Sequence, residues 1–479
     1  MFYLKFLEEI KKSGLFSSLD EVQTVKFSLP RRFKGYDCAI RLSCVDNSLT
    51  EKIPSLPYFI TDYVRIGNYI NFVLEKKCFS EWCWELLNDI LSDNYKLQER
   101  NVVVEHTSLT PAYPLNIATF RSSVIGDALV RGFRHITKNV SADYFVEDTA
   151  RQLNWIPILF DEGKIKSTGS KIDHCYGRVF AEQCKENKNL PLSLNDIKEM
   201  FPYGEYEVNN CRLNVFVDKK SVSRSCLQGN LESLREAGIH FDLFHYESNI
   251  IGDGNENISY VQKNAELYKR LADISTKVYT VVPGTQSTKI VKAIKWYKLS
   301  KSIKPIYFGN VYFEKDGMLQ TDKISEGRFH SIDAIVKEIG QHYHMNKDAS
   351  FNTLKLILLK YNRIEKVVFH PLGDDQYKCY QRLCERLKNI HDWIIRETEE
   401  KFGNEIYTLS KKCMIAYSRY TKDFLEDAEF DNWINCLSEI EDCIIRCKEK
   451  HQYNNSIMNS AYSFLIWGYT MIGIEIVEF

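Results

Sequence analysis

At 479 residues the chain exceeds an ordinary single domain, and its length favours about three domains. Apolar residues make up 44% of the chain and aromatic residues 13%, which is enough to build well-packed cores. Charged residues nearly cancel to a formal net charge of -1. A global basic field is therefore excluded, and any contact with nucleic acid has to come from local patches.

The 14 cysteines are scattered along the chain. None forms a Cys-x-x-Cys pair and no His-x-x-x-His partner follows, so we expect no metal site and no disulfide framework. Free thiols of this kind are typical of a reducing, cytoplasmic setting.

Neither end of the chain has the pattern of a membrane segment. Met1–Leu15 mixes charged and apolar residues and has no uninterrupted core of the signal type. Ala461–Val477 is the most apolar run, but it is short and contains Glu475, which favours a buried helix. We therefore expect a soluble protein with no membrane partner.

The first hundred residues indicate a mixed α and β unit. Val64–Leu74 is rich in β-branched and aromatic residues, with Gly67-Asn68 as a turn, and predicts strands. Phe79–Leu91 follows with apolar residues at helical spacing.

The middle of the chain has the pattern of a doubly wound α/β domain. Asn101–Glu105 is a short apolar run typical of a buried parallel strand, and Phe120–Phe133 then predicts a helix. The strand expected next completes a βαβ unit. We expect the strands of this part at four further places: Asp143–Val146, Leu213–Val217, Val278–Val282 and Pro305–Phe313.

From about Ala349 the pattern changes to that of an all-α bundle. Leu383, Leu387, Ile390 and Ile394 recur at helical spacing, and proline nearly disappears after Pro371. The predicted fold is thus an N-terminal α+β domain over residues 1–98, a Rossmann-like catalytic domain over 99–348 and a helical domain over 349–479.

The stretch Val102–Gln152 resembles the arginyl-tRNA synthetase family. That family has a strand ending in Glu, a Ser-Pro-Asn-Pro loop, a His-x-Gly-His box, an Arg-Ser-x-x-x-Gly-Asp segment and an Asn-Asp-x-Gly-x-Gln block. The residues that hold these places are Glu105, Arg121-Ser122, Gly126-Asp127, Asp148 and Gln152.

Four further segments resemble the same family, in the same order, so the resemblance covers almost the whole chain. They match the N-terminal additional domain, a Phe-Asp…Glu-Ser segment, the strand that ends in a substrate-contacting Gln, and the closing helix of the DALR anticodon-binding domain. The segments are Leu29–Ala39 with Val64–Leu74, Phe241-Asp242 with Glu247-Ser248, Tyr279–Gln286, and Ala461–Glu478.

The resemblance also shows what this chain has lost. In class I synthetases the two histidines of the His-x-Gly-His box stabilise the charge that develops on the ATP phosphates. Asn116 and Thr119 stand at those positions here and carry no positive charge. Lys323 occupies a place comparable to the Lys-Met-Ser motif, either as a phosphate contact or as a solvated loop lysine. We therefore expect adenylation to be crippled.

Arginine recognition is partly retained in this comparison. The resemblance implies that Glu105 and Gln286 contact the arginine, since a buried carboxylate suits a guanidinium. Asp148 keeps its place, and Thr110 replaces the family's loop Asn. The family's Tyr-x-x-x-Asp pair has nearby candidates in Tyr268 and Asp273, although their spacing is one residue off.

Cations interleaved with tyrosines in the helical part suit a single-stranded RNA loop, although a solvated helix face is the usual explanation of such runs. The resemblance favours binding of tRNA(Arg). The cations are Lys355, Lys360, Arg363, Lys366, Lys378, Arg382, Arg386 and Lys388, and the tyrosines are Tyr361, Tyr377 and Tyr380.

Three functions remain open from the sequence. The first is an aminoacyltransferase that takes arginyl-tRNA as donor and an amine, or a second aminoacyl-tRNA, as acceptor, as cyclodipeptide synthases do. Ser108 is its candidate nucleophile, and it needs no cofactor. The second is a non-catalytic adaptor that binds tRNA. The third is a divergent but active arginine-tRNA ligase, in which case ATP is a substrate.

Overall fold

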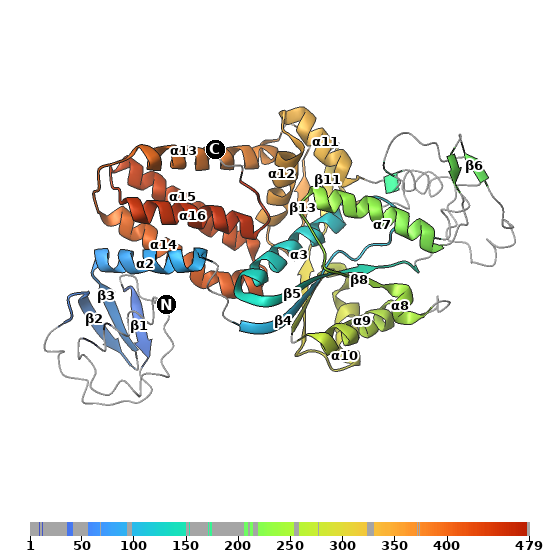
Figure 1. The fold of residues 1–479 in the computed structure, drawn as a ribbon, viewed down its shortest axis with the longest axis horizontal. Helices are drawn as coiled ribbons and strands as arrows, with labels where there is room; N and C mark the ends of the chain where they lie inside the picture. Colours follow the sequence, from blue (N-terminus) through green and yellow to red (C-terminus); the bar gives the residue numbers. More distant parts are fainter. Residues whose placement is uncertain are drawn as a thin grey trace.

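The computed structural model describes residues 36–41, 56–67, 69–92, 98–149, 219–252, 258–275, 277–322, 330–370 and 374–476, with the short pieces 206–208 and 211–213 and the single residues 9, 12, 153, 171, 173, 174 and 372. Figure 1 shows an N-terminal sheet, a central parallel sheet and a helical bundle. Together they confirm the predicted fold class.

The N-terminal unit is a three-stranded antiparallel sheet in the order β1-β3-β2 with one helix packed on it. The predicted turn lies between β2 and β3, where Gly67 has a φ of 58°. The helix predicted over Phe79–Leu91 is confirmed and begins earlier, because Glu75 caps it by accepting from the backbone N–H of Cys78 at 2.8 Å. These elements are β1 (Cys38–Arg41), β2 (Ile60–Ile66), β3 (Tyr69–Leu74) and α2 (Lys76–Leu91).

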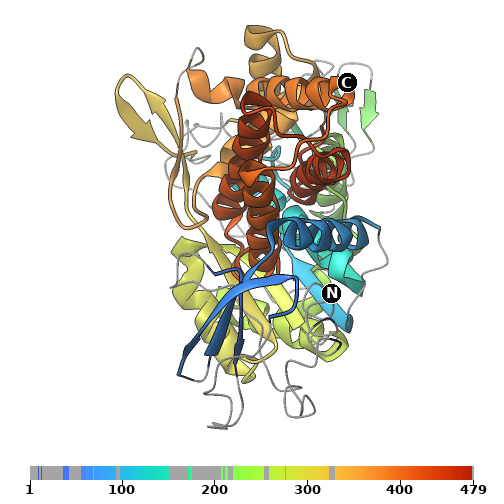
Figure 2. The ribbon, with the colours of Figure 1, turned by 90° about the vertical axis from the view of Figure 1, so that its left-hand side faces the viewer.

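A buried carboxylate fixes this unit to the bundle. Asp37 is fully buried and accepts from the backbone N–H of Leu74 at 2.8 Å. The same carboxylate forms an ion pair of 2.7 Å with Lys411 and accepts from the hydroxyl of Tyr407, both in the bundle. Figure 2 shows the result, with the N-terminal strands below α2 and the bundle helices above it.

The central sheet has five parallel strands in the order β10-β9-β4-β5-β8. β4 is the first of them in the chain, and the later strands are added first on one side of it and then on the other. The boundary between β4 and β9 is therefore the topological switch point, where open α/β sheets bind ligands. The strands are β4 (Gln98–Glu105), β5 (Thr137–Val146), β8 (Leu243–Tyr246), β9 (Lys277–Pro283) and β10 (Ile303–Phe308).

Helices cover both faces of this sheet (Figure 1). On one face Val102 and Val104 of β4 belong to a core shared with α3, α7 and the bundle. On the other face Val103 packs in a separate core with α9 and α10, because successive strand side chains alternate in direction. The helices are α3 (Ile117–Ile136), α7 (Lys219–Glu236), α9 (Tyr260–Ile274) and α10 (Ser287–Trp296).

Three expected elements differ in detail. The strand predicted over Pro305–Phe313 is two strands, β10 and β11 (Val311–Lys315), because the chain turns at Gly309, where a Cβ atom would lie 2.3 Å from a backbone oxygen of Glu365. β11 pairs with β12 (Met318–Gln320) and β13 (Val367–Phe369). β13 interrupts the segment expected to be all-α, since its β-branched residues add to this small sheet. The strand expected at Leu213–Val217 lies outside the described residues beyond Leu213, which ends β7 (Cys211–Leu213).

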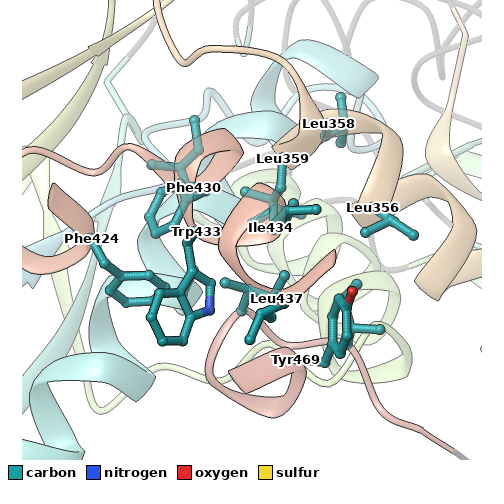
Figure 3. Close-up of a cluster of buried hydrophobic side chains, with 14 of the residues drawn as sticks. Leu356, Leu358, Leu359, Phe424, Phe430, Trp433, Ile434, Leu437 and Tyr469 are labelled. Atoms are coloured by element: carbon teal, nitrogen blue, oxygen red, sulfur yellow. The ribbon is translucent and has the colours of Figure 1, made fainter. Parts of the chain in front are cut away.

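The bundle consists of five helices with one shared hydrophobic core, part of which Figure 3 shows around Trp433, Leu437 and Tyr469. All four apolar residues predicted to share a face of α13 are buried, as is most of the apolar C-terminal run. The helices are α12 (Lys347–Lys360), α13 (Cys379–Arg396), α14 (Asn404–Arg419), α15 (Phe430–Glu449) and α16 (Asn455–Met471).

This core runs from α3 through α12 into the bundle, and α12 crosses the predicted boundary between residues 348 and 349. The division at 98/99 and 348/349 therefore stays a prediction. No helix in the described part of the chain is both long and apolar enough to cross a lipid bilayer.

Candidate functional site

Two side chains meet at the switch point. Glu105 is the last residue of β4, and its partner in the parallel register is Thr280 of β9. The Thr280 hydroxyl donates to the Glu105 carboxylate, and the hydroxyl of Tyr268, from α9, lies 3.3 Å from that of Thr280. We call Glu105, Thr280, Tyr268, Glu147 and Tyr260 the strand-end cluster.

The cluster contains a buried carboxyl group whose pKa is close to neutral pH. Only 3% of Glu105 is exposed, and this burial raises the pKa of Glu105 to about 7. The hydrogen bond from Thr280 opposes the shift, whereas the nearby carboxylate of Asp143 adds to it. A cationic ligand would favour the ionised form, so the electrostatics of the site suit a positively charged ligand.

The loop after β4 is strained. Thr107 has a φ of 65°, a backbone conformation that β-branched residues rarely adopt. Two hydrogen bonds hold it there: its hydroxyl lies 2.6 Å from that of Ser123 and 2.8 Å from Nδ1 of His106. Burial lowers the pKa of His106 to about 3, so this imidazole is neutral. The strain turns the chain so that Ser108 is exposed directly beside the cluster.

Glu147, which follows β5, connects this loop to the cluster. Its carboxylate accepts from the Thr110 hydroxyl at 2.8 Å and from the Ser108 hydroxyl at 3.4 Å. The loop runs parallel to the end of β5, with Leu109 bridged to Val146. Ser108 and Thr110 thus share one carboxylate, which the sequence had not singled out.

Asn116 and Thr119 are occupied by the start of α3. Asn116 is the N-cap, and its side-chain oxygen accepts from the backbone N–H of Thr119 at 2.8 Å. The Thr119 carbonyl in turn accepts from the hydroxyls of Ser122 and Ser123 at 2.8 and 3.0 Å. The amide of Asn116 and the hydroxyl of Thr119 are neutral donors at a helix N-terminus where the resembled family has two imidazoles.

Lys323 lies outside the described residues. The residues that flank its segment are close to α3: Ser331 is bridged to Asn116, and the backbone N–H of Ile332 donates to the Leu115 carbonyl at 2.9 Å. His330 and Asp322 also approach each other, with Nδ1 and Oδ1 2.7 Å apart. Both ends of the segment that carries Lys323 are thus joined to the region beside the helix start.

Asp148 orients a neighbouring helix. Its carboxylate accepts from the backbone N–H of Ser248 at 2.9 Å and from the Ser248 hydroxyl at 2.6 Å, which fixes α8 (Glu247–Ile251) beside the end of β5. Gln286 lies just beyond β9, and its buried Oε1 has no hydrogen-bond partner among the described residues. That acceptor is available to a donor group of a ligand.

The structure brings one member of the expected arginine-contacting pair to the cluster. Tyr268 is fully buried and reaches the cluster through Thr280. Asp273 does not take part, because it is exposed near the end of α9, at the opposite edge of the sheet from Glu105. The structure therefore does not bring Asp273 to the cluster, and its contact with arginine stays a prediction.

Tyr260 and Asn264 fit the required spacing better and had been missed. Tyr260 is the first residue of α9; burial raises its pKa, and the nearby carboxylates of Glu147 and Glu105 raise it further. Asn264 lies one turn later, is 6% exposed and donates to the Tyr260 carbonyl at 2.8 Å. The pair has the spacing Tyr-x-x-x-Asn, which differs from the expected Tyr-x-x-x-Asp in its last residue. The capping Ser259 before this helix was the available sequence signal.

Three of the eight cations predicted to bind tRNA line one groove of the bundle, with a volume of about 580 Å³. We call it the bundle groove. Lys360, Arg382 and Arg386 contribute charge to it, and Tyr361 an aromatic ring. Gln376 also lines it, and its amide oxygen and nitrogen are both buried without a partner among the described residues.

The other predicted cations lie elsewhere. Arg363 donates to the carbonyls of Asp427 and Tyr307, at 2.7 and 3.0 Å, and therefore stabilises the fold. Lys378 is exposed beside the groove and pairs with Asp375 at 3.6 Å. Lys355 is 3% exposed and donates to the Gly473 carbonyl at 2.8 Å, so it is not available to RNA. Tyr377 and Tyr380 are likewise buried and cannot stack on a base.

Comparison with known proteins bears on this arrangement. No protein-family model matches the chain. The arginine–tRNA ligase of Methanothermobacter thermautotrophicus is 28% identical over 238 residues, which is 47% of this chain and 41% of the relative. That of Methanobrevibacter smithii is 28% identical over 242 residues, 49% of this chain and 40% of the relative. The chain thus spans about two fifths of the length of the curated relatives it matches.

The fold agrees over a longer range than the sequence. The arginyl-tRNA synthetase of Thermus thermophilus superposes with a TM-score of 0.67 at 13% identity and covers 98% of each chain. That of Plasmodium falciparum superposes with a TM-score of 0.61 at 14% identity, over 99% of this chain and 97% of its own. The chain is thus similar in sequence to arginine–tRNA ligases over about half of its length, and its fold is similar to that of arginyl-tRNA synthetases over nearly all of it.

Proposed function

We propose that the chain binds tRNA(Arg), holds the arginyl group of arginyl-tRNA at the strand-end cluster and passes it to an amine acceptor. One observation carries this proposal. The buried Glu105 suited to a guanidinium is retained, whereas Asn116 and Thr119 supply no positive charge at the helix start. Losing one preorganised donor typically raises a barrier by about 3 kcal/mol, so this combination favours use of an activated arginine over its activation.

The transfer needs no ATP, because an aminoacyl ester is already activated. Ser108 Oγ attacks the ester carbonyl of arginyl-tRNA, and Glu147 accepts the hydroxyl proton. The ester bond between the arginyl group and the tRNA breaks. The terminal ribose hydroxyl of the tRNA leaves and takes the proton from Glu147. The amine of the acceptor then attacks the seryl ester, forms an amide and restores the serine hydroxyl. With an aminoacyl-tRNA as acceptor, the α-amino group of the transferred arginine then attacks the ester of the second tRNA. That ester breaks, the tRNA leaves through its terminal hydroxyl with the amine proton, and the cyclic dipeptide closes.

The bundle groove provides a second reason to place RNA on this chain. Lys360, Arg382 and Arg386 line it together with Tyr361 and the unpaired amide of Gln376. A cation, an aromatic ring and an amide with a free donor and acceptor are the groups that recognise an unstacked base in an RNA loop.

A paired assay with purified protein tests the proposal. One reaction contains ATP, labelled arginine and uncharged tRNA(Arg); the other contains arginyl-tRNA, a mixture of aminoacyl-tRNAs and no ATP. We expect loss of arginine from tRNA and a new arginine-containing product in the second reaction only. Charging in the first would make the chain an active ligase, and silence in both with tight tRNA binding would make it an adaptor.

The Ser108→Ala variant tests the nucleophile. It should abolish trapping of a covalent arginyl-protein intermediate while leaving arginyl-tRNA binding intact. Ser248→Ala provides the matched control, because that hydroxyl bonds Asp148 and lies outside the transfer route. Product formation by Ser108→Ala at the wild-type rate would exclude Ser108 and leave direct attack by the acceptor amine.

A further inference from the structure

The stretch from Ser287 to Lys304 has an unusual charge pattern. It places a lysine at every third residue and contains neither Asp nor Glu, in a chain whose net charge is -1. A solvated helix face normally alternates the two signs. The lysines are Lys289, Lys292, Lys295, Lys298, Lys301 and Lys304.

The structure exposes five of these lysines on α10 and directly after it. Ile290, Ala293 and Ile294 form the buried side of α10, which packs in the core shared with α9. The opposite side is exposed and carries Lys289, Lys292 and Lys295. Lys298 and Lys301 follow the end of the helix and are exposed as well. We call these five residues and Trp296 the α10 lysine face. Trp296 is 54% exposed among them.

The charges on this face are not neutralised. Among the described residues, no carboxylate lies within ion-pair distance of Lys292, Lys295, Lys298 or Lys301. Lys289 lies 5.3 Å from the ring of Tyr260, and Lys304 is set apart from the face by its pairing with Asp427 at 3.3 Å. Like charges one helical turn apart repel each other, so the face favours a polyanionic partner.

Its place in the fold separates it from the bundle groove. α10 begins directly after Gln286, at the carboxyl ends of the parallel strands, where the strand-end cluster lies. It then runs back towards the amino ends of these strands. Figure 1 shows it on the side of the sheet away from the bundle. From Lys289 to Lys295 the helical rise spans about 9 Å, enough for neighbouring phosphates of a nucleic acid, and Lys298 and Lys301 follow the end of the helix.

We propose that the α10 lysine face binds the phosphate backbone of an RNA and that Trp296 stacks on an unpaired base. Lysines act as point charges on phosphates, and an exposed aromatic ring among them suits single-stranded nucleic acid. An anionic membrane fits less well, because the apolar side of α10 is already buried against α9 and only isolated apolar side chains remain outside. This contact goes beyond the proposed transfer and does not depend on it.

The test measures RNA binding by the full chain at several salt concentrations. The probes are a labelled tRNA(Arg), an unrelated RNA hairpin with a single-stranded tail, and a blunt-ended RNA duplex with no unpaired base. The logarithm of the RNA association constant decreases linearly with the logarithm of the salt concentration. In the variant Lys292→Gln/Lys295→Gln/Lys298→Gln we expect the magnitude of this negative slope to decrease by about 2 to 3. Affinity for every probe should fall at least tenfold. Trp296→Ala should weaken only the probes with an unpaired segment, by roughly 5- to 100-fold.

A matched control removes three exposed lysines elsewhere, Lys315→Gln/Lys337→Gln/Lys448→Gln, with the same change in net charge. Equal loss in this control, or unchanged slopes in the α10 variant, would overturn the proposal. So would binding to phosphatidylserine vesicles that disappears in the α10 variant while RNA binding persists. The unrelated RNA probes carry no arginyl group, so they report RNA binding alone. The outcome of this test is therefore independent of the transfer proposal.

Discussion

The Glu105 carboxylate accepts a hydrogen bond from the Thr280 hydroxyl across the boundary between β4 and β9. The chain connects β4 to strands on one side of it, whereas β9 and β10 lie on its other side. The bond therefore lies at the switch point, where α/β sheets bind ligands. Tyr268 supports Thr280 from behind at 3.3 Å. The result is a carboxyl group that is fixed in position and largely desolvated before any ligand arrives.

Glu105→Gln should weaken arginine binding while preserving the fold. The amide oxygen of Gln can still accept from Thr280, but the charge that pairs with a guanidinium is gone. We expect arginine or an arginyl ester analogue to bind at least about 30-fold more weakly, as for loss of one partner of a buried charge pair. Calorimetry measures this. Asp273→Asn is the control, since Asp273 is exposed at the other edge of the sheet; an unchanged affinity in Glu105→Gln would remove Glu105 from the site.

Arginine binding should strengthen as the pH rises from about 6 to about 8. The pKa of Glu105 is raised to about 7 by burial, so below this value the free protein holds a neutral carboxyl group that must lose its proton to pair with a cation. The shift in melting temperature caused by arginine should therefore be larger at the upper end of this range. Glu105→Gln should show no such dependence. A shift that is equal at both ends in the wild type would contradict the assignment.

The fold was readable from the sequence because hydrophobic periodicity and β-branched runs coincide with its elements. β4 lies at the short apolar run that predicted a buried strand, and α3 and α13 lie where helical spacing predicted them. The strand over Pro305–Phe313 was not read correctly, because its break at Gly309 is set by close approach of Glu365, a residue far along the chain. The local residue pattern around Gly309 does not indicate a contact with a residue so distant in the sequence.

The candidate site was readable only in part. Glu105 and Gln286 follow strands, so their positions at one sheet edge could be inferred. Tyr260 and Asn264 could not be placed without knowing where α9 begins. Basic residues in the bundle gave the weakest guide: Lys355 and Arg386 have the same sequence character, yet one is buried and the other lines a groove. Which face of a helix is covered depends on tertiary packing.

Arg386 and Arg382 should separate stability from RNA binding. Arg386 lies 2.9 Å from Glu441, which is 2% exposed, whereas Arg382 pairs with the exposed Asp375. Arg386→Ala leaves a buried carboxylate without its cation. It should lower the free energy of unfolding by about 1–3 kcal/mol, less than for a fully buried pair because Arg386 itself is 42% exposed.

Arg382→Ala should leave stability unchanged, since exposed ion pairs contribute little. Both variants should weaken binding of tRNA(Arg), because both side chains line the bundle groove. Urea denaturation and fluorescence anisotropy measure the two effects. Full tRNA affinity in a folded Arg382→Ala protein would argue against the groove as an RNA site.

Gly126→Ala should be strongly destabilising, and His106 should be the reason. A Cβ atom at position 126 would lie 2.1 Å from Cγ of His106, a side chain that is fully buried. Overpacking of this kind typically lowers stability by about 1–3 kcal/mol. The imidazole has no room to withdraw, because its ring also packs against Phe241, with the ring centroids 4.7 Å apart.

The double variant His106→Ala/Gly126→Ala distinguishes this clash from a loss of helix flexibility. Removing the imidazole frees the space that the new methyl group needs, so the double variant should be more stable than the sum of the two single effects predicts. Urea denaturation of the four proteins gives the coupling free energy, which should be about 1 kcal/mol or more in favour of the double variant. Additive effects would mean that α3 and the strained loop at Thr107 are not in contact through His106.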